Sequence, residues 1–251
     1  MSTSFKVIGS GAIKVLVLHG WGGSSDSWKD FCELAIKSEP NFSFIIPDLP
    51  GFGQTTEPNN KDGWGVSDYL IWVKDFLLDY EKKSGSKVNN LLTHSYGGRI
   101  AIKWLAENDS QFKNIILTAA AGIPLPKTLR TKLLSNLSKL KNVVPKNLES
   151  GLRNTYYKLL KIKDYNQNSV FLQNSFKKAV QEDLTPFLSM INQPVTLVWG
   201  REDSYTPLWQ GELMQEKIAN SELIILENTR HGIHLQSPDQ LVKICCQKFT
   251  S

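Results

Sequence analysis

The sequence has few cysteines and no long apolar run, and each absence excludes a class of protein. Of its three cysteines, Cys245 and Cys246 are adjacent, where a disulfide would be strained, and this leaves Cys32 without an obvious partner. No run approaches the roughly 18 uninterrupted apolar residues of a membrane span, and the first residues lack the apolar stretch of a signal peptide. We therefore expect a cytoplasmic protein that is not inserted into a membrane.

The sequence also lacks a large net charge and long runs of like charge. The formal net charge is +5, no five like charges follow one another, and no nucleic-acid motif occurs. We therefore expect no nucleic acid as a partner. The composition, 41% hydrophobic and 21% charged, is that of a globular chain, and 251 residues suffice for one large core or two small ones. The sequence contains no internal repeat and no low-complexity segment.

What is present is an alternation of short apolar runs with helical patterns. The runs indicate buried parallel strands, because they are rich in β-branched residues and almost continuously apolar. They cover residues 14–18, 44–46, 88–93, 114–118, 195–199 and 223–226. Apolar residues at helical spacing indicate helices within 66–77 and 100–105. This alternation predicts an α/β fold with a mostly parallel sheet and helices on both of its faces.

Residues 122–186 interrupt the alternation. They contain no strand-like run, and leucines and tyrosines at 129–140 and 156–160 recur at helical spacing. We predict a helical cap inserted into a core made of residues 1–121 and 187–251. Apolar faces of such helices would supply a wall for an acyl chain.

The predicted cap is the basic part of the chain. It carries twelve basic and four acidic residues, whereas the core carries 17 basic and 20 acidic residues. A field of one sign over a cleft attracts an anionic substrate or an acidic carrier protein. Lysines on the solvated faces of short helices explain the same composition more simply, and both interpretations stay open.

A serine stands at a predicted bend from strand to helix, in the sequence Thr93-His94-Ser95-Tyr96-Gly97. In a nucleophile elbow the serine lies on a strained turn, so small residues are needed two positions before and two positions after it. Gly97 fits this pattern, and Thr93 replaces the usual glycine. The alternative is a glycine-rich turn whose serine caps a helix.

A second glycine-rich loop, residues 19–23 (HGWGG), follows the first predicted parallel strand. An acyl-transfer hydrolase needs a backbone N–H at this place to hold the oxyanion of a tetrahedral intermediate. The candidate donors are the amides of Trp21 and Tyr96. Together with Gly20 and His94, these two residues are also the candidates for lining the substrate pocket. A tight loop without a binding role is the alternative.

Asp203 and His231 each follow one of the last two predicted strands. Carboxyl ends of parallel strands meet at one edge of a sheet, so both residues and Ser95 can converge there. Serine is a weak nucleophile until a histidine accepts its proton, and the histidine needs a carboxylate to fix its tautomer. Other residues compete for both roles: Glu202 and Asp48 as the acid, and His19, His94 and His234 as the base.

Together these segments resemble the α/β-hydrolase superfamily, in the right order and over nearly the whole chain. The matching pieces are residues 19–23 (HGWGG), 48–53 (DLPGFG), 93–97 (THSYG) and 199–203 (WGRED), and His231 with Pro238 seven residues later. Within the superfamily, the chain is most similar to small capped hydrolases. These include carboxylesterases, pimeloyl-carrier methyl esterases and meta-cleavage-product hydrolases.

The resemblance implies that Ser95 is the nucleophile, His231 the general base and acid, and Asp203 the orienting acid. It places Asp48 in a structural turn. The implied reaction is hydrolysis of carboxylic esters with short or medium acyl chains through an acyl-enzyme, without a metal or an organic cofactor. The expected partner is a small-molecule ester, anionic or carrier-linked, bound by a monomer or a homodimer.

Two other functions remain open. A carbon–carbon bond hydrolase of vinylogous diketones shares the triad and the cap, and a ligand receptor without turnover can use the same scaffold. A serine nucleophile disfavours haloalkane dehalogenase and epoxide hydrolase activity, because those relatives use aspartate. Thr229 and Arg230 replace a small residue and a glycine, and Gln236 replaces a frequent glutamate, so the loop that holds His231 is expected to differ.

Overall fold

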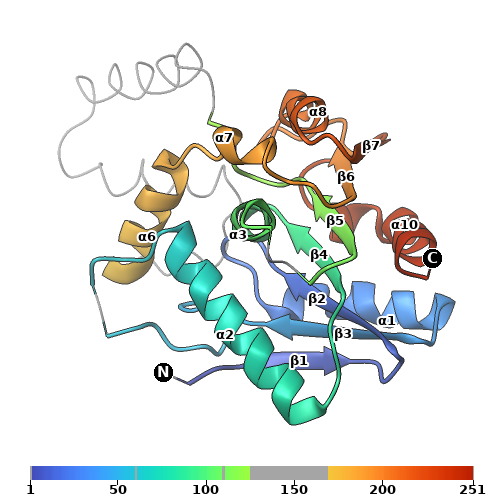
Figure 1. The fold of residues 1–251 in the computed structure, drawn as a ribbon, viewed down its shortest axis with the longest axis horizontal. Helices are drawn as coiled ribbons and strands as arrows, with labels where there is room; N and C mark the ends of the chain where they lie inside the picture. The colour runs from blue at the N-terminus through green and yellow to red at the C-terminus, as the bar shows by residue number, and fades with distance from the viewer. Residues whose placement is uncertain (1, 60, 109–110, 125–168, 251) are drawn as a thin grey trace, which may run out of the picture.

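The computed structural model describes residues 2–59, 61–108, 111–124 and 169–250, and in them seven strands form one sheet. The strands are β1 (Phe5–Ile8), β2 (Ile13–Leu18), β3 (Phe42–Pro47), β4 (Asn90–His94), β5 (Asn114–Thr118), β6 (Val195–Gly200) and β7 (Ser221–Leu226). Their order is β1-β3-β2-β4-β5-β6-β7 (Figure 1). β1 runs antiparallel to β3, and every other neighbouring pair is parallel. The predicted mostly parallel sheet is confirmed.

Helices cover both faces of the sheet, as predicted. They are η1 (Ser25–Trp28), α1 (Lys29–Ser38), α2 (Val66–Ser84), α3 (Tyr96–Ala106), α6 (Val170–Gln181), α7 (Thr185–Leu188), α8 (Leu208–Lys217), α9 (Ile233–Gln236) and α10 (Pro238–Phe249). α1 and α10 pack on one face, and α2, α3 and α8 pack on the other (Figure 1). None of the helices in the described ranges is long and apolar enough to cross a membrane.

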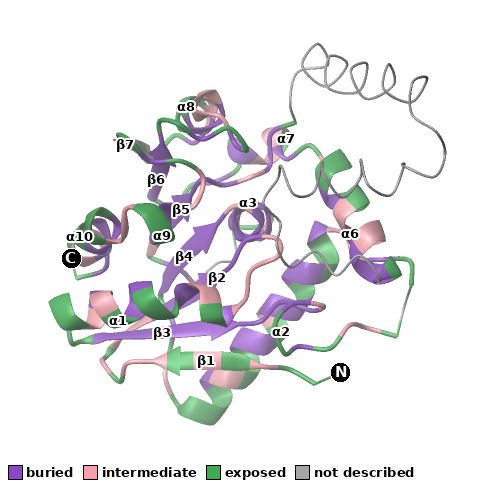
Figure 2. Cartoon of the chain, turned by 180° about the vertical axis from the view of Figure 1, so that it is seen from behind, coloured by how far each residue is buried: buried purple, intermediate pink, exposed green. Residues whose placement is uncertain are grey.

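The strands in the interior of the sheet are mainly apolar because each of them contributes side chains to two cores. Side chains alternate along a strand, so Leu16 and Leu18 of β2 enter the core under α2 and α3. Val15 and Val17 of the same strand enter the core under α1 and α10. β3, β4 and β6 are buried along their whole length (Figure 2). This double burial explains why the sequence pattern identified the strands of the sheet interior.

One strand was not predicted, and the bounds of the predicted strands shift by up to two residues. β1 was not predicted, because it is a partly exposed edge strand in which Phe5 and Val7 remain 45% and 44% accessible. The predicted strand 88–93 begins instead at Asn90 and includes His94. Val88 is buried, but its N–H donates to the carboxylate of Glu81 at 2.8 Å and not to a neighbouring strand.

Most of the predicted cap lies outside the described residues. Residues 125–168 include both predicted helical stretches, 129–140 and 156–160, and ten of the twelve basic residues of the cap. The described remainder of the predicted cap contains α6 and the beginning of α7, and no strand.

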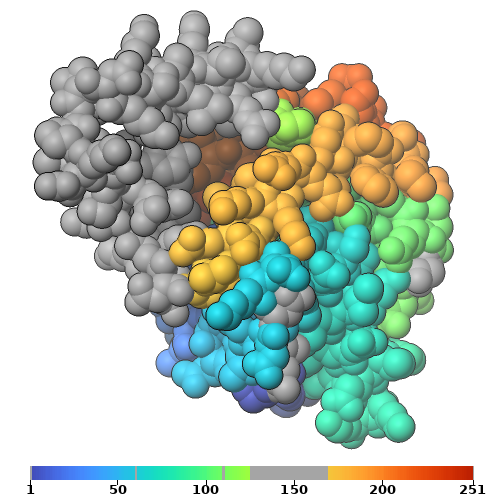
Figure 3. Space-filling model, turned by 90° about the vertical axis from the view of Figure 1, so that its left-hand side faces the viewer, coloured from blue at the N-terminus to red at the C-terminus, as the bar shows by residue number. Residues whose placement is uncertain are grey.

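α6 is bound to the loop that precedes α2, as Figure 3 shows for the yellow helix beside the cyan segment. The Ser175 hydroxyl accepts the N–H of Trp64 at 2.7 Å, and Lys178 Nζ donates to the carbonyl of Gly63 at 2.8 Å. A side chain on Gly63 would collide with the α6 backbone, and its φ is 73°. Only glycine therefore allows the loop to approach the helix this closely.

The end of α6 is attached to α3. The buried guanidinium of Arg99 donates to the carbonyl of Glu182 at 3.0 Å, and Lys103 Nζ pairs with the Glu182 carboxylate at 2.5 Å. A cation at a helix C-terminus satisfies a carbonyl that has no partner within the helix. α6 is thus fixed relative to the helix that begins just after Ser95.

Candidate active site

Ser95 lies between β4 and α3 in a strained conformation. Its φ is 50° and its ψ is −107°, a region that residues other than glycine rarely adopt. Three backbone hydrogen bonds hold it there: its N–H donates to Thr118, and its carbonyl accepts from Gly98 and Ala121, at 2.9 to 3.1 Å. The hydroxyl therefore projects from a turn that the surrounding strands fix, as a nucleophile elbow requires.

Two glycines let α3 begin close to the sheet. A Cβ on Gly97 would collide with the carbonyl oxygen of Leu18 in β2, and one on Gly98 would lie 2.5 Å from the Ala120 Cβ. Thr93, the residue in place of the usual glycine, lies in β4 and is completely buried. A β-branched residue fits there because the backbone at that position is still extended.

The structure brings Ser95, His231 and Asp203 together. His231 Nε2 lies 3.0 Å from Ser95 Oγ, and His231 Nδ1 lies 2.8 Å from Asp203 Oδ2. The Asp203 side chain has no exposed surface, whereas 19% of the His231 side chain is accessible. The three residues follow the carboxyl ends of β4, β7 and β6. This geometry permits proton transfer from the serine to the imidazole while the carboxylate holds the opposite ring nitrogen.

The Asp203 carboxylate has donors besides His231. Oδ1 accepts the N–H groups of Tyr205 at 2.8 Å and of Thr206 at 3.0 Å, and Oδ2 accepts the Thr206 hydroxyl at 2.8 Å. These donors fix the orientation of the carboxylate beside His231. Thr206 was not among the residues predicted for the site. The available signal was an Asx-type turn, in which the Asp203 side chain accepts the N–H groups of the residues two and three positions later.

The alternative acids lie elsewhere. Glu202 is exposed, and its N–H donates to the Thr229 carbonyl at 3.0 Å. The carboxylate of Asp48 accepts the N–H of Ser25 at 2.6 Å and the N–H of Gln54 at 3.0 Å. Asp48 therefore fastens two loops together, in agreement with the structural turn that the resemblance implied.

His19 supports the glycine-rich loop. It is completely buried, its Nε2 accepts the N–H of Leu49 at 3.0 Å, and its Nδ1 lies 2.8 Å from the Gly20 carbonyl. Because Nε2 is an acceptor, Nδ1 carries the hydrogen and donates it to Gly20. Burial lowers the pKa of His19, so the ring is neutral near pH 7.

His94 and His234 form a buried imidazole cluster beside His231. The ring centroid of His94 is 4.8 Å from that of His231 and 5.0 Å from that of His234, and His234 stacks on Trp28 at 4.2 Å. Burial lowers the pKa of His94 well below its ordinary value and that of His234 to about 3, and nearby His231 acts in the same direction. Both rings are therefore neutral neighbours of His231.

The loop with the first predicted oxyanion donor lies against the elbow. A Cβ on Gly20 would be 3.2 Å from Ser95 Cβ and 3.1 Å from His94 Cδ2, so Gly20 lies beside the serine. The ring of the next residue, Trp21, packs on Tyr96. Tyr96 occupies the first position of α3, where a backbone N–H has no acceptor within the helix. Both predicted donors thus belong to segments that border Ser95.

Aromatic side chains surround this loop. The Trp21 ring lies 4.9 Å from Phe52, 4.9 Å from Tyr96 and 5.3 Å from Phe176 of α6, measured between ring centroids. The edge-to-face pairs with Phe52 and Tyr96 are a favourable arrangement of aromatic rings. Burial raises the pKa of Tyr96 well above its ordinary value. The segment next to the serine is therefore apolar.

The residues near His231 that differ from the family pattern make hydrogen bonds within their own loop. Gln236 accepts the N–H of Arg230 at 2.8 Å through its amide oxygen. The buried Thr229 hydroxyl lies 3.0 Å from the Glu227 carbonyl and 2.6 Å from the Ser237 hydroxyl. Polar side chains at these positions therefore close the loop before and after the histidine.

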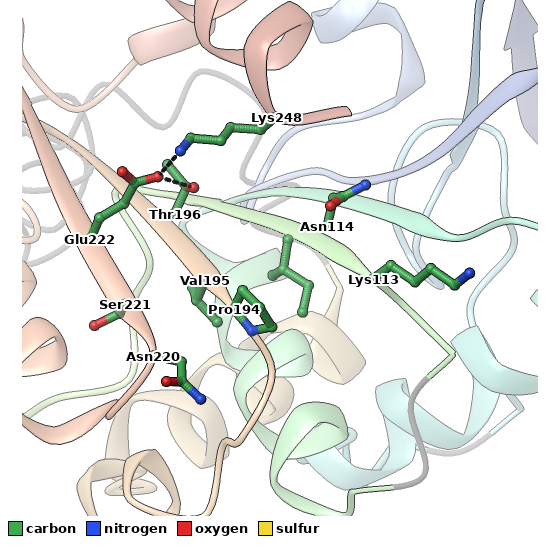
Figure 4. Close-up of a pocket in the computed structure, with 10 residues that line it drawn as sticks. Lys113, Asn114, Pro194, Val195, Thr196, Asn220, Ser221, Glu222 and Lys248 are labelled. Atoms are coloured by element: carbon green, nitrogen blue, oxygen red, sulfur yellow. Dashed lines mark hydrogen bonds and ion pairs between the residues drawn. The ribbon is translucent and has the colours of Figure 1, made fainter. Parts of the chain in front are cut away.

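A surface pocket lies at the opposite edge of the sheet, at the amino ends of β5, β6 and β7, with a volume of about 220 Å³ (Figure 4). Its Glu222 pairs with Lys248 at 2.5 Å and accepts the Thr196 hydroxyl at 2.7 Å. These charges neutralise one another. In the described ranges, no three histidine, cysteine or acidic side chains are arranged to hold a metal ion.

Comparison with known proteins gives consistent matches. A family model described as alpha/beta hydrolase fold matches residues 14–162. Monoacylglycerol lipase ABHD6 of Bos taurus is 22% identical over 92% of this chain and 73% of its own length. Lipase 3 of Moraxella sp. (strain TA144) is 25% identical over 86% of this chain and 71% of its own length. The structure of the esterase EaEST from Exiguobacterium antarcticum superposes with a TM-score of 0.74 at 20% identity, and covers 99% of this chain and 96% of that one.

Proposed function

Because the chain belongs to the alpha/beta hydrolase fold family, we propose that it is a carboxylesterase that works through a Ser-His-Asp triad. Its relatives include lipases and its fold neighbours include an esterase, which supports ester hydrolysis. The observation that carries the proposal is the continuous contact from Ser95 Oγ through the His231 ring to Asp203, at 3.0 and 2.8 Å.

Acylation is the first half of the proposed reaction. His231 Nε2 accepts the Ser95 hydroxyl proton while Oγ bonds to the ester carbonyl carbon, and Asp203 stabilises the imidazolium that forms. The amides of Trp21 and Tyr96 donate to the oxyanion. When the tetrahedral intermediate collapses, the imidazolium protonates the departing alkoxide, and the alcohol leaves an acyl-enzyme on Ser95.

Deacylation reverses these roles with water as the nucleophile. His231 accepts a proton from the water as its oxygen attacks the acyl carbonyl carbon, and the same amides hold the second oxyanion. Collapse expels the Ser95 oxygen, which recovers the proton from the imidazolium. One ester and one water thus give one acid and one alcohol, and the enzyme is regenerated.

The aromatic side chains around Trp21 suggest the acyl site. Trp21 and Phe176 of α6 are partly exposed and lie against each other, and the buried rings of Phe52 and Tyr96 support Trp21. We assign this surface to the acyl chain of the substrate, because apolar and aromatic walls are typical of small-molecule sites. Short or medium acyl esters suit it. An anionic or carrier-linked substrate stays a hypothesis that depends on charges mostly beyond the described residues.

The Ser95→Ala variant tests the nucleophile. We expect at least a thousandfold loss of kcat on p-nitrophenyl butyrate, since the variant keeps the binding surface but forms no acyl-enzyme. Ser189→Ala, an exposed serine after α7, is the matched control and should retain full activity. Circular dichroism and the melting temperature should show that both variants are folded. Full activity of folded Ser95→Ala would remove the serine from the mechanism.

A fluorophosphonate probe separates an enzyme from a receptor. We expect stoichiometric labelling of the wild-type protein at Ser95 and none of the Ser95→Ala variant, because only an activated serine attacks the phosphorus. A folded wild-type protein that is neither labelled nor active on esters would favour ligand binding without turnover.

Cleavage of a vinylogous diketone much faster than of any ester would favour carbon–carbon hydrolysis.

A further inference from the structure

The buried hydroxyl of Thr206 lies where three parts of the site meet. Its Oγ1 is 2.8 Å from Asp203 Oδ2, 3.3 Å from His231 Nδ1 and 3.2 Å from the carbonyl oxygen of Ala119. Ala119 directly follows β5, the strand between those that lead to Ser95 and to Asp203. The hydroxyl thus contacts the acid, the base and the end of the intervening strand.

The Thr206 hydroxyl donates its hydrogen to the Asp203 carboxylate. The distance to Oδ2 is shorter than the distance to the Ala119 carbonyl, 2.8 against 3.2 Å, and a charged acceptor makes the stronger hydrogen bond. The hydrogen on His231 Nδ1 also points to Oδ2, at 2.8 Å. Two donors, one from a threonine and one from the histidine, therefore share a single carboxylate oxygen.

The backbone of Thr206 is held on both sides. The Thr206 N–H donates to Asp203 Oδ1 at 3.0 Å, and the Thr206 carbonyl accepts the indole N–H of Trp199 at 2.7 Å. Trp199 belongs to β6 and is completely buried. With the backbone anchored on both sides and a β-branched side chain, the hydroxyl has little rotational freedom.

The geometry points to Thr206 as a positioning residue that keeps the Asp203–His231 pair aligned with Ser95. This inference rests on the proposed esterase function. The backbone donors hold Oδ1, so without the hydroxyl His231, a partly exposed side chain on a loop, is the one donor to Oδ2 among the described residues. Thr206 is buried, so it offers almost no accessible surface to a substrate. Its loss should lower turnover and leave substrate binding unchanged.

Thr206→Val and Thr206→Ser test this role as a matched pair. Valine has the shape of threonine without the hydroxyl, and serine keeps the hydroxyl without the methyl group. We expect kcat to fall about tenfold in Thr206→Val, as when about 1.4 kcal/mol of transition-state stabilisation is lost. KM should stay within about twofold of the wild-type value, and Thr206→Ser should have nearly wild-type kcat. Thr206→Ala, which also lacks the hydroxyl, should behave like Thr206→Val and replaces it if the valine variant does not fold.

The hydrogen between His231 and Asp203 provides a readout that does not need turnover. Its far-downfield proton NMR signal, assigned by its absence in His231→Gln, should move in Thr206→Val, because Oδ2 then has one donor fewer. The signal should stay in place in Thr206→Ser. If the wild-type protein hydrolyses no ester, the proposed function fails, and this comparison alone still decides the role of Thr206.

Two outcomes would overturn the inference. One is a Thr206→Val variant with an unmoved NMR signal and, where esters are cleaved, an unchanged kcat. The other is a Thr206→Ser variant that is as impaired as Thr206→Val, because the methyl group and its packing would then matter instead of the hydroxyl.

Discussion

At the scale of single residues, Thr93 is the most visible departure from the nucleophile-elbow pattern. Its hydroxyl is buried and has no hydrogen-bond partner in the part of the chain that the structure describes, whereas its carbonyl accepts the Thr118 hydroxyl at 2.7 Å. A buried hydroxyl without a partner costs free energy that folding must offset. The elbow thus tolerates threonine but gains nothing from its oxygen.

Thr93→Val should therefore stabilise the protein. Valine keeps the shape and removes the unpaired oxygen, and we expect the free energy of unfolding to rise by about 1 kcal/mol in urea denaturation. Thr118→Val is the matched control, because that hydroxyl donates to Thr93 and lies 3.2 Å from His94 Nδ1, so its loss should destabilise. A destabilised Thr93→Val would show that the hydroxyl has a partner, such as a bound water.

The sequence allowed prediction of those site residues that directly follow a buried strand. Ser95, Asp203 and His231 each follow a buried strand, so chain order alone brings them to one edge of the sheet. Thr206 was missed because its hydroxyl matters only where Asp203 meets His231, which is distant in sequence. The imidazole cluster was missed for the same reason: side-chain packing, not spacing, brings its members together.

At the scale of elements, Glu81 joins α2 to the segments before β4 and β5. Its buried carboxylate accepts Lys87 Nζ at 2.6 Å, the Val88 N–H at 2.8 Å and the side-chain amide of Gln111. Burial by itself raises the pKa of Glu81, but these hydrogen bonds together hold the pKa below its ordinary value. One side chain near the end of the helix thus fixes two connections.

Glu81→Ala should destabilise the protein by about 2 kcal/mol in urea denaturation at pH 7, because it leaves the buried Val88 N–H without its acceptor. Asp79→Ala on the same helix is the control. Asp79 is exposed and pairs with Lys83 at 2.7 Å, one turn away, so its loss should change little. Equal effects of the two substitutions would contradict the linking role of Glu81.

Strand order is the property of the elements that the sequence could not provide. Continuous apolar runs identified strands buried on both faces, and their alternation with helices implied parallel pairing. The exposed edge strand β1, in contrast, has no such run, and its antiparallel pairing with β3 depends on contacts made only in the folded chain. Burial therefore determines which strands a sequence reveals.

At the scale of the whole molecule, three buried histidines couple stability to pH. Burial lowers the pKa of His19, His94 and His234, the last to about 3, whereas an unfolded chain protonates histidine near pH 6.5. Below pH 6.5 the unfolded state therefore binds protons that the folded state does not bind. The contribution of these residues is complete above pH 6.5 and is lost progressively as the pH falls toward the folded values.

Urea unfolding at pH 7, 6 and 5 should measure this coupling. His234 alone should lower the free energy of unfolding by about 2 kcal/mol between pH 7 and 5, and His19 and His94 should add to the slope. Glu81, whose folded pKa is also lowered, acts mainly below this window, because unfolded glutamate protonates near pH 4.3.

His234→Gln isolates one part of the slope. Glutamine does not titrate, so the variant should lose less stability than the wild-type protein between pH 7 and 5, by about 2 kcal/mol, whatever its stability at pH 7. Lys243→Gln, on the exposed side of α10, changes a charge without removing a buried titrating group and should keep the wild-type slope. A wild-type slope in His234→Gln would mean that the ring is already protonated or solvated in the folded protein. The buried cluster beside His231 would then be open to water.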